Sequence, residues 1–212
     1  VRQIADVEID DKISFVIKKT EEIMEDSEYQ GVRLSLDAYL DKTRIPLKID
    51  ISTGDVITPC EISFSYQLMF ENRTIPLLAY PPETVLAEKL ETILSRGEAN
   101  TRLRDFYDVY ILQREDFVVT PDALCHALLA TCRKRGHEDL LHTYASILDR
   151  VRQSDTMRTQ WMKYQSDFDY AAGITWDTVL DTVETLCIKT LDDHAFGDEL
   201  PQEESQFEMH LL

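Results

Sequence analysis

The spacing of the apolar residues changes once along the chain, at Pro81 and Pro82. Before this point apolar and polar residues alternate, which is typical of strands with one buried face. After it, apolar residues recur every three or four positions, as they do along one face of a helix. A chain whose strands all precede its helices predicts an α+β fold with the two kinds of structure segregated.

Three segments carry the strand pattern, and turn-forming residues separate them. They are VRLSLDAYL (32–40), IPLKIDIS (45–52) and ISFSYQLMF (62–70). In the second, we expect Ile45, Leu47, Ile49 and Ile51 to point inward and Lys48, Asp50 and Ser52 outward. Residues 12–24 predict a further strand or strand pair. Strands joined by such short connections favour an antiparallel or mixed sheet.

The helical part begins with ETVLAEKLETILSR, whose stripe of Leu86, Leu90, Ile93 and Leu94 predicts a buried face ending at Gly97. A second helix is expected from residue 100 or 101 to residue 112, and a fourth over 138–152. Thr120 with Pro121, Ser154, and Thr175 are the predicted N-terminal caps of the third, fifth and sixth helices. In the fifth, the inward residues are predicted to be Met157, Trp161, Tyr164 and Phe168.

These patterns divide the chain into residues 1–80, a β-rich part, residues 81–191, a helical domain, and residues 192–212, an acidic tail. The tail contains seven acidic side chains and no Lys or Arg. We expect it to be mobile, because it is rich in acidic residues and contains one glycine and one proline. An acidic interaction protein that works through this tail is the plainest functional alternative.

The formal net charge of −18 argues against a nonspecific nucleic-acid binder that relies on phosphate contacts. A nucleic-acid substrate would need a local basic patch, or a further segment or partner that supplies the positive charge. No apolar run is long enough for a membrane span, and the first residues lack the features of a signal peptide, so we expect a cytoplasmic protein. The four cysteines are scattered and predict free thiols rather than a disulfide framework or a zinc site.

Two single residues are candidates for chemistry. Asp50 is a carboxylate on the polar face of a strand, where it could bind a metal ion or form an exposed ion pair with Lys48, which shares that face. Lys89 lies in the middle of a helix, at the edge of its apolar stripe. Its side chain could extend to water, or it could direct its ammonium into a cleft and bind a phosphate.

The segment TRLRDFYDVY (101–110) combines charged and aromatic residues on a predicted helix. Arg102, Asp105 and Asp108 are spaced three apart and share one sector of that helix, while its aromatic residues supply a packing face. Two aspartates at this spacing repel one another unless a cation is near, and Lys89, Arg102 and Arg104 are available. The pattern fits either a surface ion-pair network or part of a site.

The order of these signals resembles the AbiEii- and AbiGii-like nucleotidyltransferase toxins of bacterial abortive-infection toxin–antitoxin systems. The resemblance is carried by YQGVRLSLDAYL, PLKIDISTGDVITP and YPPETVLAEKLETILSRGEANTRLRDFYDVYIL. It extends more loosely through the helices to about residue 191. The segment from ETVLAEKLETIL to NTRLRDFYD is its most specific part.

The resemblance implies a polymerase-beta-like nucleotidyltransferase sheet followed by a C-terminal helical bundle. It implies that Asp50 is the third metal-binding carboxylate and that Lys89 contacts the phosphates of a nucleotide. Asp105 and Asp108 would close the site, flanked by Arg102 and Arg104. The implied chemistry is Mg²⁺-dependent transfer of a nucleotidyl group from a nucleoside triphosphate, with tRNA as one class of acceptor and an antitoxin protein as partner.

The chain departs from the family pattern in one respect. The family's first motif, a Gly-Ser or Gly-Gly turn followed by a strand with Asp-x-Asp, has no counterpart here. The nearest segment, ADVEIDD, offers Asp6, Glu8 and Asp10 without a preceding glycine turn. We therefore expect that several tens of residues precede Val1 in the complete protein and that this fragment is inactive alone. The alternative is a non-catalytic module of the same fold that binds an antitoxin or a nucleotide.

Overall fold

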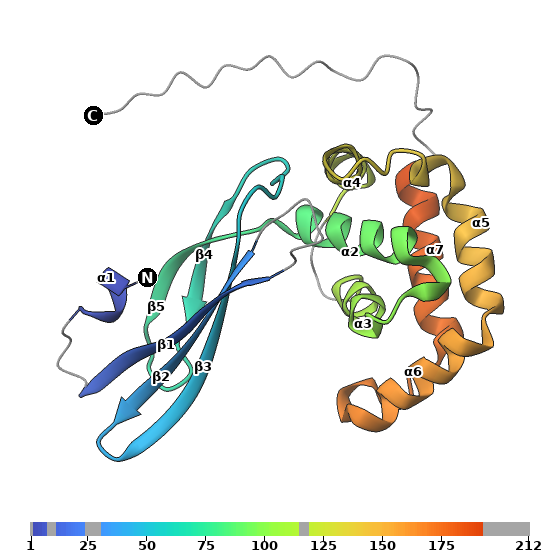
Figure 1. Ribbon diagram of the computed structural model, residues 1–212. Coiled ribbons are helices and arrows are strands. Elements are labelled where there is room, and N and C mark those ends of the chain that lie inside the picture. Colours follow the sequence, from blue (N-terminus) through green and yellow to red (C-terminus); the bar gives the residue numbers. More distant parts are fainter. Residues whose placement is uncertain (1, 8–11, 24–30, 115–118, 193–212) are drawn as a thin grey trace, which may run out of the picture. The chain divides into compact units, whose positions relative to one another are not determined.

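The computed structural model describes residues 2–7, 12–23, 31–114 and 119–192 of the chain (Figure 1). Within this part there are five strands in two antiparallel sheets, and all of them precede the six long helices. A short helix α1 (Arg2–Ala5) comes before the first strand. The α+β class predicted from the change of periodicity is therefore confirmed.

The chain divides into two compact units, Val1–Val56 and Ile57–Leu212. The first unit contains a three-stranded sheet formed by β1 (Ile13–Ile23), β2 (Gly31–Leu40) and β3 (Thr43–Ser52). The strand order is β1-β2-β3, and both pairings are antiparallel. The register places Arg33 opposite Asp50. Cross-strand neighbours on one face can touch, so this register decides which cation Asp50 meets.

The second unit begins with a hairpin of β4 (Ile62–Gln67) and β5 (Thr74–Ala79), followed by the helices. The long helices are α2 (Pro82–Arg96), α3 (Leu103–Leu112), α4 (Pro121–Lys134), α5 (Leu140–Gln153), α6 (Asp155–Asp167) and α7 (Trp176–Leu191). Two 3₁₀ turns, η1 (Gly97–Ala99) and η2 (Asp169–Ala171), follow α2 and α6. Helix α2 contacts α3, α4 and α5, and α7 contacts α3, α4 and α5 (Figure 1).

The predicted helix boundaries agree with the structure to within about three residues. The side chains of Thr120, Ser154 and Thr175 each accept a hydrogen bond from a backbone N–H of the first turn, as expected of N-terminal caps. Helix α2 ends at Gly97, whose positive φ of 48° favours glycine. Local sequence signals are sufficient here because each cap is satisfied within its own turn.

The core of the second unit contains the stripe predicted on α2, with Leu86, Leu90, Ile93 and Leu94 at most 2% exposed. Phe106 of α3, Trp161 of α6 and Trp176 of α7 pack in the same cluster. Burial of this much apolar surface is the main stabilising contribution in a domain of this size. It also fixes which face of α2 remains for polar contacts.

Two predictions about burial were wrong. On β3, Ile45, Leu47 and Ile49 are 37–52% exposed rather than inward. Alternation shows which side chains share a face, but it does not show whether another element covers that face. In addition, β3 is an edge strand of its sheet, with β2 as its neighbour. Phe168 was expected to be buried and is 41% exposed, because α6 ends at Asp167 and Phe168 adopts an extended conformation beyond it.

The cysteines agree with the prediction of free thiols, and Cys125 and Cys132 are buried, as is Cys187. The acidic tail, apart from Asp192, and the candidates Glu8 and Asp10 lie outside the described residues. Among the described helices, none has the length and the apolar composition that crossing a bilayer requires.

Candidate functional site: a cationic pocket on the helical unit

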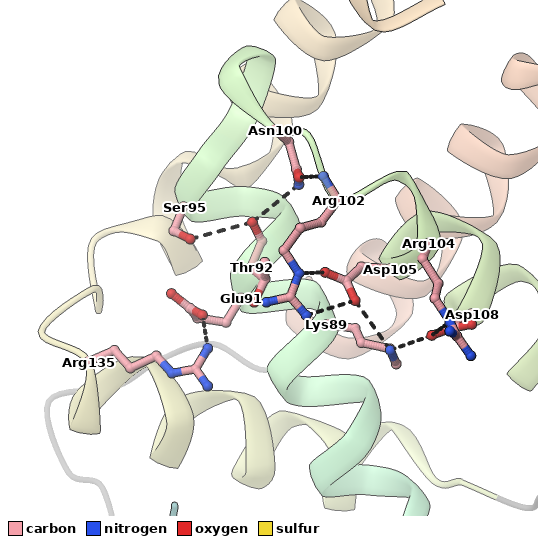
Figure 2. A network of polar contacts seen from close by, with 10 residues as sticks. All are labelled: Lys89, Glu91, Thr92, Ser95, Asn100, Arg102, Arg104, Asp105, Asp108 and Arg135. Carbon is pink, nitrogen blue, oxygen red and sulfur yellow. Dashed lines mark hydrogen bonds and ion pairs between the residues drawn. The ribbon is translucent and has the colours of Figure 1, made fainter. Parts of the chain in front are cut away.

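Helices α2 and α3 bring Lys89 against two aspartates of the RDFYD segment (Figure 2). The Nζ atom of Lys89 lies 2.6 Å from Oδ2 of Asp108 and 3.3 Å from Oδ1 of Asp105, and it donates a hydrogen bond to each. The lysine side chain is 19% exposed and that of Asp105 only 3%. The ammonium is therefore held in place by two carboxylates at the edge of the core.

Arg102 and Arg104 add positive charge to the same carboxylates. The Nε atom of Arg102 lies 2.7 Å from Oδ2 of Asp105, and Arg104 lies 3.8 Å from Asp108. The arginine side chains are 55% and 77% exposed, respectively. Both guanidinium groups are more than half exposed, so a ligand that carries negative charge can reach them while they remain near the carboxylates.

Asn100 fixes the turn that leads into α3. It is fully buried, and its Oδ1 accepts a hydrogen bond of 2.7 Å from the backbone N–H of Arg102. Its Nδ2 donates to the carbonyl oxygen of Thr92 on α2, at 3.4 Å (Figure 2). Since one side chain ties the end of α2 to the start of α3, Asn100 controls where Arg102 and Asp105 lie relative to Lys89. The sequence pattern indicated only that a helix starts near this residue.

A pocket of about 750 Å³ opens beside this network. It is lined by residues of α2, of α3 with the turn before it, and of α6 together with Phe168 just beyond its end. They are Lys89, Thr101, Arg102, Leu103, Arg104, Asp105, Asp108, Gln160, Lys163, Tyr164, Asp167 and Phe168. The lining contains four cationic and three anionic side chains. This local excess of positive charge contrasts with the net charge of −18 of the whole protein.

The wall that α6 contributes is partly aromatic. The rings of Tyr164 and Phe168 have centroids 4.7 Å apart, and Tyr170 lies 5.3 Å beyond Phe168. Burial, followed by the hydrogen bond with Tyr170, raises the pKa of the Tyr164 hydroxyl above its ordinary value. Tyr164 is thus neutral at physiological pH, and it contributes a ring and a hydroxyl to the pocket rather than a charge.

A second polar cluster lies on another side of α2. The carboxylate of Glu91 is 2% exposed and pairs with Arg135 (Figure 2). It also lies 2.7 Å from Nδ1 of His137. These contacts join α2 to the end of α4 and the residue that follows it. None of the three residues lines the pocket. Their evident role is to hold two helices of the bundle together.

Asp50 belongs to the first unit, on β3. Its two carboxylate oxygens each accept a hydrogen bond of 2.7 Å from Arg33 on the neighbouring strand. The hydrogen bond from Arg33 lowers the pKa of the Asp50 carboxyl below its ordinary value. The exposed ion pair considered from the sequence is present, although its partner is Arg33 rather than Lys48. The carboxylate is 49% exposed, so this pair is exchangeable.

No group of three or more His, Cys, Asp or Glu side chains that could bind a metal ion occurs among the described residues. Asp50 supplies one carboxylate, and Asp105 and Asp108 are occupied by cationic side chains. A magnesium ion prefers an oxygen-rich shell of nearly octahedral geometry. The described carboxylates therefore do not complete a magnesium site by themselves.

The structure thus brings together five of the six predicted site residues, namely Lys89, Arg102, Arg104, Asp105 and Asp108. The roles assigned to them remain predictions. Sequence reasoning missed the contribution of α6, where Gln160, Lys163 and Asp167 lie about one turn apart and face the pocket. The spacing of three and four was a usable signal, but the apolar stripe beside it suggested only core packing.

Comparison with known families gives a match that extends over residues 1–182 of the 212. Neither curated proteins nor solved structures give a match. The matching segment includes Asp50 and every residue that lines the pocket. The chain belongs to the AbiEii family, the nucleotidyl transferase toxins of type IV toxin–antitoxin systems.

Proposed function

We propose that this protein transfers nucleotidyl groups from a nucleoside triphosphate to an acceptor such as tRNA, and that the pocket beside Lys89 binds the triphosphate. The observation that carries the proposal is the excess of cationic side chains in a pocket of an otherwise acidic protein. Family membership supplies the class of reaction. The volume of about 750 Å³ is within the range of small-ligand sites and suits one nucleotide.

The contacts of Lys89 support its proposed role in binding phosphate. An ammonium group has three N–H donors, and two of them bind Asp105 and Asp108. The third donor is left for a phosphate oxygen at the mouth of the pocket. The aspartates hold the ammonium in one position before the ligand arrives, which reduces the loss of conformational entropy on binding. Arg102 and Arg104 would then neutralise further phosphate charge.

The family resemblance is the reason for including Mg²⁺ and Asp50 in the proposed function. We propose Asp50 as one ligand of a catalytic magnesium ion, on a strand of a polymerase-beta-like sheet. Its support is that the pair with Arg33 is exposed, so a divalent cation can displace the guanidinium. Calorimetric titration with Mn²⁺ tests this directly. Binding that Asp50→Asn does not weaken would remove Asp50 from the set of ligands.

Transfer is tested by incubating the purified full-length protein with each α-³²P-labelled nucleoside triphosphate, Mg²⁺ and either tRNA or an unstructured RNA. We expect label in tRNA, and we expect loss of labelling in Lys89→Ala and Asp50→Ala. Lys189→Ala is the matched control, because Lys189 is an exposed lysine on α7 outside the pocket. Labelling that survives Lys89→Ala would contradict the assigned site.

The same experiment separates this proposal from the non-catalytic alternative. Nucleotide binding that depends on Lys89, without any transfer to RNA, would indicate a binding module. The partner expected from a toxin–antitoxin system is a cognate antitoxin, and we propose that it limits the toxicity of this protein in the cell. Co-expression of the adjacent gene should restore growth of cells in which the toxin alone is expressed and inhibits it.

A further inference from the structure

An aromatic cluster lies at the α6 side of the pocket. It consists of Tyr107, Tyr164, Phe168 and Tyr170, whose neighbouring rings have centroid separations of 4.7–6.4 Å. Phe168 and Tyr170 are 41% and 50% exposed, and their planes differ by only 27°. Two stacked rings that are both about half exposed present apolar edges and faces to solvent. Such a surface is unfavourable in water unless a ligand covers it.

The exposed rings rest on a rigid base. Tyr164 stacks on Trp161, which is 1% exposed, with ring centroids 5.3 Å apart and planes 24° apart. The indole N–H of Trp161 donates to the carbonyl oxygen of Ile174 at 2.8 Å. The hydroxyl oxygens of Tyr164 and Tyr170 lie 2.9 Å apart, in hydrogen-bond contact. These contacts fix the surface before any ligand binds, which favours affinity.

The aromatic surface and the cations belong to one pocket. Tyr164 and Phe168 line it together with Lys89 and Arg102. An aromatic wall next to a cluster of cations matches the two parts of a nucleotide, its base and its phosphates. Bases stack on aromatic side chains because every base has a π face, and the phosphates bind Lys and Arg.

A polar atom without a partner lies in the same lining. The Oε1 atom of Gln160 is buried and accepts no hydrogen bond within the described part of the chain. A buried acceptor without a donor is unfavourable, and such atoms in a pocket point to a missing ligand donor. The amino group of a base and the hydroxyls of a ribose are donors of the required kind.

We propose that Tyr164 and Phe168 form the base subsite of the pocket, in which the nucleobase of the nucleoside triphosphate stacks on Phe168 and Gln160 Oε1 accepts a hydrogen bond from the base or the ribose. This inference rests on the proposed function, since it assumes that the phosphates bind near Lys89. The observations favour a mononucleotide over a long nucleic acid, because the rings and the cations lie within one pocket rather than along an extended basic surface.

The test compares a nucleoside triphosphate with inorganic tripolyphosphate, which carries the charge without the base. Affinities of the full chain for ATP, GTP, CTP, UTP and tripolyphosphate are measured by calorimetry. The variants are Phe168→Ala, Phe168→Trp and Lys89→Ala. Phe70→Ala is the matched control, since Phe70 is 93% exposed and lies outside the pocket. Phe168 is itself 41% exposed, so its replacement should leave the fold intact.

We expect at least one nucleoside triphosphate to bind more tightly than tripolyphosphate. Phe168→Ala should weaken that nucleotide by about 5- to 100-fold, the range seen when an aromatic residue that stacks on a base is removed. It should leave tripolyphosphate unchanged, and Phe168→Trp should restore nucleotide binding. Lys89→Ala should weaken both ligands, because it removes a phosphate contact.

The possible negative results distinguish the base subsite from the phosphate site. Equal affinities for nucleotide and tripolyphosphate, or no effect of Phe168→Ala while Lys89→Ala weakens both, would overturn the base subsite alone. Binding of neither ligand, or binding that Lys89→Ala leaves unchanged, would overturn the phosphate site and the base subsite with it. A third result is that Phe168→Ala weakens binding of a single-stranded oligonucleotide but leaves nucleotide binding unchanged. This would overturn the base subsite and show that the rings bind the acceptor RNA instead.

Discussion

The ammonium of Lys89 on α2 lies 2.6 Å from a carboxylate oxygen of Asp108 on α3, and this pair joins two helices at the edge of the helical core. The two residues are 19 positions apart in sequence. Since both side chains are about one fifth exposed, the contact is sheltered from solvent yet still open to the pocket. The arrangement stabilises the fold and leaves the ammonium available to a ligand.

Replacing Lys89 by methionine should destabilise the helical unit by about 1–3 kcal/mol, because two carboxylates lose their shared cation and Asp105 is almost fully buried. Asp105 retains Arg102, which limits the loss. Urea unfolding followed by the fluorescence of Trp161 and Trp176 gives the free energy. In the double variant Lys89→Met/Asp108→Asn part of this loss should be recovered. Additive effects of the two replacements would show that the pair is not coupled.

Asn100→Ala should lower the free energy of unfolding by about 1–3 kcal/mol, because the part-buried backbone N–H of Arg102 and the carbonyl oxygen of Thr92 both lose the side chain that binds them. The replacement should also reduce nucleotide affinity, since Arg102 and Asp105 are then less well positioned. Asn72→Ala is the matched control, as Asn72 is an exposed asparagine outside the pocket. Equal behaviour of the two variants in unfolding and in binding would remove the positioning role from Asn100.

The thiols should differ sharply in reactivity. Burial, followed by the charge of Glu91, raises the pKa of Cys132 to about 12, and burial raises that of Cys187 to about 12. Burial also raises the pKa of Cys125, whereas Cys60 is exposed. At pH 8 a disulfide reagent should therefore modify one thiol rapidly in the native protein and all four in urea. Cys60→Ser should abolish the rapid phase, and a second rapid thiol would contradict the burial of the others.

Asp37 should make the first unit sensitive to acid. Burial opposes ionisation of this carboxyl, but Arg44 and Lys18 outweigh it and place its pKa below the ordinary value of 3.8. A carboxyl whose pKa is lower when folded stabilises the protein above its unfolded-state pKa, and this contribution is lost as the pH falls through the folded-state value.

The carboxyl carbon chemical shift of Asp37 should therefore titrate below pH 3.8 in the native protein. Arg44→Met removes the nearer cation, so the titration should move to higher pH, and Asp37→Asn should reduce the loss of stability in acid. Lys12→Met is a control, because Lys12 is an exposed lysine of the same unit that precedes β1. An unchanged titration in Arg44→Met would contradict the assigned cause.

The sequence alone determined the order and kind of the elements. The change of periodicity at Pro81 separated strands from helices, and the caps at Thr120, Ser154 and Thr175 were predicted residue by residue. These features depend on interactions within one strand or one helical turn, so a local pattern is enough to predict them. The pairing of Lys89 with RDFYD could be suspected from charge alone, since two neighbouring aspartates need a cation.

Only the tertiary structure decided what surrounds these residues. It added Asn100 and the α6 residues Gln160, Lys163 and Asp167 to the site, and it assigned Arg33 rather than Lys48 to Asp50. It also exposed Phe168 and the apolar face of β3. Such facts depend on which helix crosses which, on strand register and on whether a face is covered. These are set by long-range packing, which the period of a single segment does not encode.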